Sequence, residues 1–117
     1  QQQLGLTHKQ QSEIAWSLYR DNSPIHPSSG KISSQEIKEQ TQQSLENLKN
    51  ILEAGKSSIE NVLKTTVFLK NINDFSKMNE IYSTYFKTNF PARVCVEVAC
   101  LPKDALIEIE AIALVKQ

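Results

Sequence analysis

The end of the chain alternates between two kinds of residue so regularly that its secondary structure is strongly constrained. Residues 91–100 read PARVCVEVAC and residues 105–115 read ALIEIEAIALV, with the turn-forming sequence LPKD between them. A period of two places successive side chains on opposite faces of a β-sheet. The pattern therefore predicts two strands, and the short turn between them favours their pairing as a hairpin.

Two segments upstream have helical periodicity. Residues 33–55 carry Ile, Thr and Leu side chains three and four positions apart. Ser33 or Ser34 is the expected N-cap, and Gly55 is expected to end the helix as a C′ glycine. A second apolar stripe follows, and its simplest interpretation is core packing. It consists of Phe75, Met78, Ile81, Tyr82, Tyr85 and Phe86.

Between the two predicted helices, residues 65–69 are rich in β-branched and aromatic side chains and predict another strand. The order is then helix, strand, helix, strand and strand. With 117 residues, the chain is long enough for one domain with one core. The expected fold class is α+β, a single sheet with two helices on one face.

The charge and the cysteine content limit which partners, compartments and metal sites are expected for this chain. Thirteen basic and thirteen acidic residues give a net charge of zero, so the chain lacks the basic excess that favours nucleic-acid binding. No apolar run is long enough to span a membrane. Cys95 and Cys100 are five positions apart, on opposite faces of a flat strand, which predicts free thiols and a reducing compartment. Together with His8 and His26 they show no zinc-binding spacing, so no metal site is expected.

Two charged residues on the alternating segments are candidates for chemistry. Arg93 begins the first segment after Pro-Ala, and Glu108 lies in the IEIE run of the second. In a hairpin about residues 101–105, Arg93 lies level with residues near 113, so the two need not meet within one chain. Both can be solvated edge charges, because a charge on an apolar strand either reaches solvent or finds a partner. The alternative is an arginine that clamps a carboxylate and a glutamate that handles protons.

A family resemblance bears on this choice. The run PARVCVEVACLPKDALIEIEAIAL resembles the C-terminal signature of the Rid family of enamine/imine deaminases, also called YjgF-like or L-PSP endoribonuclease proteins. The runs QTQQSLENLKNILEAG, NVLKTTVFLKNINDF and MNEIYSTYF resemble the same family in the same order. The resemblance covers residues 24–117. It identifies residues 1–117 as a single Rid-type domain with an atypical segment over residues 1–23.

The resemblance implies a fold, an assembly and a pocket. The fold is chorismate-mutase-like (YjgF-like), and three copies form a homotrimer around a central barrel with pockets between subunits. Arg93 falls on the family's arginine that binds the substrate carboxylate, and Glu108 falls on the glutamate that positions or activates water. Cys95 falls on a cysteine that lines the pocket, and Asn79 on a residue near it. No metal or organic cofactor is implied.

The implied activity is hydrolysis of reactive 2-enamine and 2-imine acids, such as 2-aminoacrylate and 2-iminobutanoate, to 2-keto acids and ammonia. The partner is then a small 2-imino acid rather than a nucleic acid or a membrane, and the location is the cytoplasm or the mitochondrial matrix. Two other functions stay open. One is an endoribonuclease or translation inhibitor, as the family's older name suggests, and the other is a non-catalytic trimer with a metabolite-binding or chaperone-like role.

The N-terminal segment departs from the family. Residues 6–23 contain neither of its two pocket motifs, Gly-Pro-Tyr-Ser-Gln-Ala and Ser-Gly-Gln, although the spacing from Gly5 to Pro24 matches. If one base is inserted after the codon of Gly5, the possible codons of the following residues can be read in the shifted frame. That frame permits Pro-Tyr-Ser-Gln-Ala and Ser-Gly-Gln at the positions where the family has them. We therefore interpret residues 6–23 as a frameshifted reading of the family's first hairpin, the alternative being a diverged or disordered arm. If the protein itself carries the family's residues, a β-hairpin is expected here.

Overall fold

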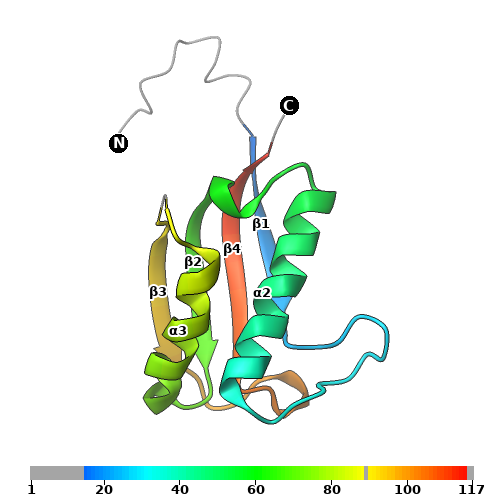
Figure 1. Ribbon diagram of the computed structural model, residues 1–117, viewed down its shortest axis with the longest axis vertical. Helices are drawn as coiled ribbons and strands as arrows, with labels where there is room; N and C mark the ends of the chain where they lie inside the picture. The colour runs from blue at the N-terminus through cyan, green and yellow to red at the C-terminus, as the bar shows by residue number, and fades with distance from the viewer. Residues whose placement is uncertain (1–14, 89, 116–117) are drawn as a thin grey trace.

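The predicted order of elements is confirmed (Figure 1). The computed structural model describes residues 15–88 and 90–115. Its strands are β1 (Ala15–Asn22), β2 (Val62–Leu69), β3 (Ala92–Glu97) and β4 (Ile107–Val115), and its helices are α2 (Ile37–Ala54) and α3 (Phe75–Tyr85). Short 3-10 turns are formed by Ile59–Asn61, Ile72–Asp74 and Pro102–Asp104.

The strands form one mixed sheet in the order β1-β4-β2-β3. β4 is antiparallel to both of its neighbours, β1 and β2, whereas β2 and β3 are parallel. The predicted hairpin between the last two strands is wrong, because β2 lies between β3 and β4. The connection after β3 passes the end of β2, where the Val98 N–H donates to the Leu69 carbonyl at 2.9 Å and the Lys70 N–H donates to the Leu106 carbonyl at 3.0 Å. α3 is thus the crossover that a parallel pair of strands requires.

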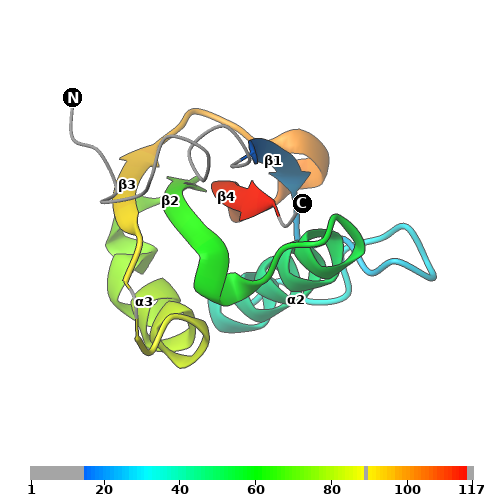
Figure 2. The same ribbon diagram turned by 90° about the horizontal axis from the view of Figure 1, so that it is seen from above.

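Both helices pack on one face of the sheet, as predicted (Figure 2). The core lies between them and the strands, and both apolar helical stripes contribute to it. Its most deeply buried side chains are Leu45, Leu48 and Leu52 of α2, Met78 of α3, Phe86 after it, and Val67, Leu69, Ile107 and Ile109 of the strands. Phe75, Ile81 and Tyr85 are partly buried against this core. The α+β class is therefore confirmed.

The ends of α2 differ in detail from the sequence prediction. No side chain caps its N-terminus, and the Ser34 Oγ instead accepts a hydrogen bond from the Glu36 N–H at 3.1 Å, before the helix begins. At the other end the left-handed residue is Lys56, with φ of 63°, rather than Gly55, with φ of −90°. Gly55 meets a different requirement, since a Cβ there would lie 2.9 Å from the Tyr19 hydroxyl oxygen.

β1 lies at one edge of the sheet and pairs with β4. Ala15 is opposite Val115 and Tyr19 is opposite Ala111, with an irregularity before Asn22. Residues 15–22 are thus extended, while residues 6–14 lie outside the described part. The first hairpin, and with it the frameshift interpretation, stays a prediction.

Neither of the two described α-helices packs on the second face of the sheet (Figure 2). Trp16 and Leu18 of β1 and Val94 and Val96 of β3 are on this open face, and their side chains are 64, 38, 43 and 36% exposed. Ile112 of β4 is opposite Leu18 and is half-buried. The valines predicted to share one face of β3 do so, and it is the open face.

Candidate functional site

Arg93 lies at the beginning of β3 and faces the helices. Its register partner on β2 is Thr65. The guanidinium carbon is 4.6 Å from the centre of the Tyr82 ring and 5.1 Å from that of Phe75. Nη1 donates a hydrogen bond to the Asn79 Oδ1 at 2.6 Å. Arg93 is therefore held against one side of α3 although its side chain stays accessible to solvent.

Beside this arginine is a cavity of about 380 Å³. Its walls include Tyr82, Phe86 and the exposed ring of Phe90, together with Asn79. Arg93 is the one charged group among the described residues that line it. The ion pairs in the described part of the chain are Lys38–Glu80 and Lys70–Asp104, so no carboxylate there neutralises Arg93. A cation with several N–H donors at the wall of an aromatic cavity can bind a small carboxylate.

Tyr82 connects this cavity to the core. Its side chain is 5% exposed, and its hydroxyl oxygen lies 2.7 Å from the Thr65 Oγ1. Burial raises the pKa of the Tyr82 hydroxyl, while the hydrogen bond with Thr65 and the charge of Arg93 oppose this rise. From the sequence, Tyr82 was interpreted as a core residue. Its position seven residues after Phe75 and three after Asn79 is the signal that all three share one side of α3.

Cys95 lies two residues beyond Arg93 on the same face of β3. It is partly buried against the core and does not line the Arg93 cavity. Burial raises the pKa of the Cys95 thiol, and the nearby Arg93 charge lowers it by less. The thiol is consequently protonated near neutral pH. Cys95 and Cys100 are both free, as predicted.

Glu108 lies on the open face and is not brought to Arg93 within one chain. Its register partner on β2 is Phe68, whereas Arg93 is level with Thr65, and the two strand positions face opposite sides of the sheet. Through β2, Arg93 is level with Ala111 of β4, not with residues near 113. The Glu108 Oε1 accepts a hydrogen bond from the buried Ser23 hydroxyl at 3.1 Å.

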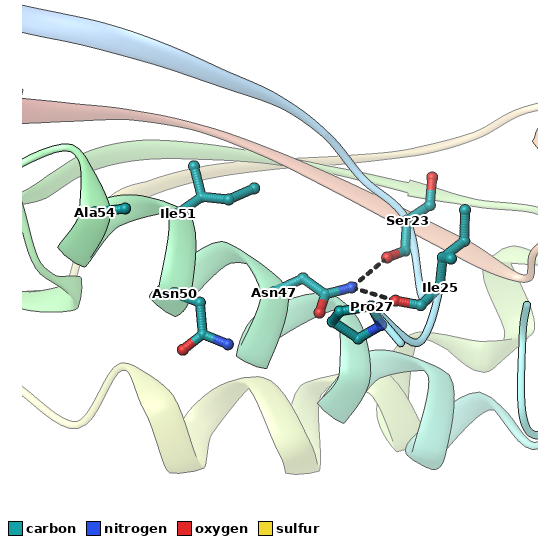
Figure 3. A pocket seen from close by; sticks show the side chains of 7 residues that line it. All are labelled: Ser23, Ile25, Pro27, Asn47, Asn50, Ile51 and Ala54. Carbon is teal, nitrogen blue, oxygen red and sulfur yellow. Dashed lines mark hydrogen bonds between the residues drawn. The ribbon is translucent and has the colours of Figure 1, made fainter. Parts of the chain in front are cut away.

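A larger cavity, of about 460 Å³, lies elsewhere, between α2 and the loop after β1 (Figure 3). Its described lining is mostly apolar and contains none of the predicted site residues. Asn47 organises it by donating from Nδ2 to the carbonyls of Ser23 at 3.0 Å and Ile25 at 2.8 Å. Asn47 thereby fixes the backbone of the residue that contacts Glu108, a link that sequence reasoning missed because it joins distant segments.

The fold and the sequence together define the class of this protein. Residues 22–115 match the family model described as endoribonuclease L-PSP, and the chain belongs to this family, the Rid or YjgF-like proteins.

Relatives in this family carry several names. A RutC family protein of Pyrococcus horikoshii is 60% identical over 90 residues, which are 77% of this chain and 71% of that protein. Human 2-iminobutanoate/2-iminopropanoate deaminase is 52% identical over 90 residues, 77% of this chain and 66% of that protein. The structure of E. coli TdcF with bound serine matches with a TM-score of 0.77 and 37% identity, covering 98% of this chain and 84% of that one.

Two further properties concern only the described residues. None of the helices in residues 15–88 and 90–115 is long and apolar enough to cross a membrane. Within the same residues, His, Cys, Asp and Glu side chains do not gather in groups of three or more that could hold a metal ion.

Proposed function

We propose that this protein hydrolyses 2-imino acids and their enamine tautomers to 2-keto acids and ammonia. The observation that carries the proposal is Arg93, a cation that no described carboxylate neutralises, at the wall of an aromatic cavity. The similarity to a protein named as a 2-iminobutanoate/2-iminopropanoate deaminase supports the same activity. In this proposal Arg93 binds the substrate carboxylate, Asn79 lines the pocket beside it, and Cys95, which is outside the cavity of the single chain, lines the pocket of the assembled trimer.

The reaction requires that the substrate is oriented and that one residue accepts a proton from water and returns it to the substrate nitrogen. Water attacks C2 of the protonated imine, its proton passes to the Glu108 carboxylate, and the electrons of the C=N bond move to nitrogen. The resulting carbinolamine receives the proton back on nitrogen from Glu108. The C–N bond then breaks and releases ammonia while the electrons of the O–H bond form the C=O bond of the keto acid, and the hydroxyl proton is transferred to ammonia. A reactive imine has a low barrier, so orientation by Arg93 supplies much of what is required.

The proposed active unit is a homotrimer whose pockets lie between subunits around a central barrel. Arg93 and Glu108 are on opposite faces of their own sheet, so a pocket that uses both must take them from different chains. The open face with Trp16, Leu18 and Val96 supplies apolar surface that a second copy can cover. We further propose that residues 1–117 form one Rid-type domain and that the protein is located in the cytoplasm or mitochondrial matrix, a reducing environment with which the two free thiols are consistent.

The test measures the hydrolysis of an imine that a second enzyme generates in the assay mixture. A pyridoxal-phosphate-dependent dehydratase acting on threonine supplies 2-iminobutanoate, and the release of ammonia is compared with the spontaneous rate. We expect the wild-type protein to accelerate release and Arg93→Ala to lower its kcat/KM by about a hundredfold or more, because a charged, bidentate contact is lost. The trimer should persist in the variant. Wild-type-like turnover by Arg93→Ala would contradict the assignment.

One alternative is a non-catalytic metabolite-binding protein, and the match to TdcF with bound serine supports the binding of a small metabolite. Serine binding that depends on Arg93, without imine turnover, would establish that function instead. The family description also names an endoribonuclease. A net charge of zero argues against it, and RNA cleavage that survives repurification and is lost in Arg93→Ala would restore it.

A further inference from the structure

One side of α3 forms a cradle for the Arg93 guanidinium. Phe75, Asn79 and Tyr82 are four and three residues apart, so they follow one another along a single side of the helix. The two rings lie within 5.1 Å of the guanidinium carbon, and Asn79 binds Nη1 between them. This contact fixes one end of the guanidinium while the cavity borders the side chain.

The three parts of the cradle are not equally rigid. Phe75 is only partly buried, whereas Tyr82 is 5% exposed and its ring contacts that of Phe86 with centroids 4.6 Å apart. The Tyr82 hydroxyl also bonds to Thr65, which is fully buried on β2. Thr65 is in turn the register partner of Arg93. Thr65 therefore connects the strand that carries the arginine with the ring against which the arginine rests.

We propose that Tyr82 is a positioning residue for Arg93, with its ring as the platform for the guanidinium and Thr65 as the anchor of the ring. An arginine side chain has many rotamers, and ordering it when a ligand arrives weakens binding. A platform that orders it beforehand removes much of this loss. The inference rests on the proposed function for the identity of the ligand, and it deepens that function by adding Tyr82 and Thr65 to the carboxylate-binding side of the site.

The kinetic test uses three substitutions and one matched control. Tyr82→Leu removes the ring, Tyr82→Phe keeps the ring but loses the hydroxyl, and Thr65→Val removes the anchor. Tyr85→Phe is the control, because Tyr85 is on the same helix and its hydroxyl bonds to Glu46, not to Thr65 or Arg93. Each variant is assayed for 2-iminobutanoate hydrolysis, and folding is checked by circular dichroism.

We expect Tyr82→Leu to raise KM about tenfold with a smaller change in kcat, since the lost cation–π contact acts on carboxylate binding. Tyr82→Phe and Thr65→Val should each raise KM about twofold to threefold, and the double variant should be no worse than either one, because both remove the same hydrogen bond. Tyr85→Phe should leave KM unchanged. Unchanged KM in folded Tyr82→Phe and Thr65→Val, or equal effects in Tyr85→Phe, would overturn the proposal.

A second readout does not depend on turnover. The Arg93 Nε–H signal is assigned by nuclear magnetic resonance from its loss in Arg93→Lys, and 2-oxobutanoate is titrated as the probe. We expect a dispersed Nε–H signal in the wild type and in Tyr85→Phe, and a signal shifted towards the position of free arginine in Tyr82→Leu and, partly, in Thr65→Val. If the wild type hydrolyses no imine but shows this pattern, the proposed function fails and the positioning role stands. If the signal is the same in all folded variants, the positioning role fails.

Discussion

The two faces of the sheet use the same four strands but differ in what covers them. On the helix-covered face, side chains such as Val67 and Ile109 are fully buried, and the charged Arg93 at the beginning of β3 is held by α3. On the open face, Val96 and Trp16 are exposed and Glu108 is half-buried beside Ser23. The first face is complete within one chain. The second carries apolar side chains that no described helix covers, and the two proposed catalytic residues are divided between the two faces.

The largest expected effect comes from placing a charge on the open face. If other copies cover this face, Val96→Asp buries a carboxylate without a partner and weakens association by several kcal/mol. We expect light scattering after size-exclusion chromatography to show a trimer for the wild type and a monomer for the variant. Ile51→Asp is the control, because Ile51 is 43% exposed on α2 and away from that face. A wild-type mass for Val96→Asp would mean that the open face is not the interface.

A smaller effect compares two isoleucines of β4. Ile109 is fully buried under the helices, and Ile112 is half-buried on the open face. Ile109→Ala should lower the free energy of unfolding by about 3 kcal/mol, the usual result of a core cavity. Ile112→Ala should approach this value only if a second chain covers it. Urea denaturation of both variants measures the difference, and a loss below about 0.5 kcal/mol for Ile112→Ala would contradict a covered face.

The smallest expected effect is a pH dependence of folding stability, caused by two tyrosines on the helix-covered side of the sheet. Burial raises the pKa of both Tyr82 and Tyr85, and the hydrogen bond and charge of Glu46 raise that of Tyr85 further. Above about pH 10 the unfolded chain loses these protons while the folded chain keeps them. Stability should therefore fall as the pH rises through 10 towards the raised pKa values, and these groups should contribute no slope below about pH 9. Tyr82→Phe and Tyr85→Phe should each reduce the fall, measured as urea midpoints between pH 8 and 11.

How far the sequence predicts this fold depends on what each pattern encodes. Alternation in residues 107–113 and the stripe from Ile37 to Leu52 fix the type of element, because burial repeats every two or every three to four residues. Alternation does not encode which strands are neighbours, so it did not reveal that β2 separates β3 from β4. It also leaves open which face of each strand is covered, and Val94 and Val96 of β3 lie on the face that no described helix covers.

The sequence predicted some residues of the candidate site but not others. Arg93 and Asn79 were identified by resemblance, and in the structure the Arg93 Nη1 donates a hydrogen bond to the Asn79 Oδ1 at 2.6 Å. The roles of Glu108 and Cys95 stay predictions, since the described chain does not bring Glu108 to the cavity and Cys95 does not line it. The sequence did not predict that Tyr82 and Thr65 belong to the site. A tyrosine in an apolar helical stripe occurs at the same spacing whether its ring packs in the core or against an arginine.

The position of β4 also determines when the sheet can form. β4 is the last of the described strands, yet it lies between β1 and β2, and its pairing with β1 places Ala15 opposite Val115. Among the described strands, β1 has no partner until β4 has been synthesised. The pairing of β1 with β4 must therefore wait until both described helices and the two intervening strands have been made. Pairing between such distant segments slows folding and prolongs the exposure of strand edges.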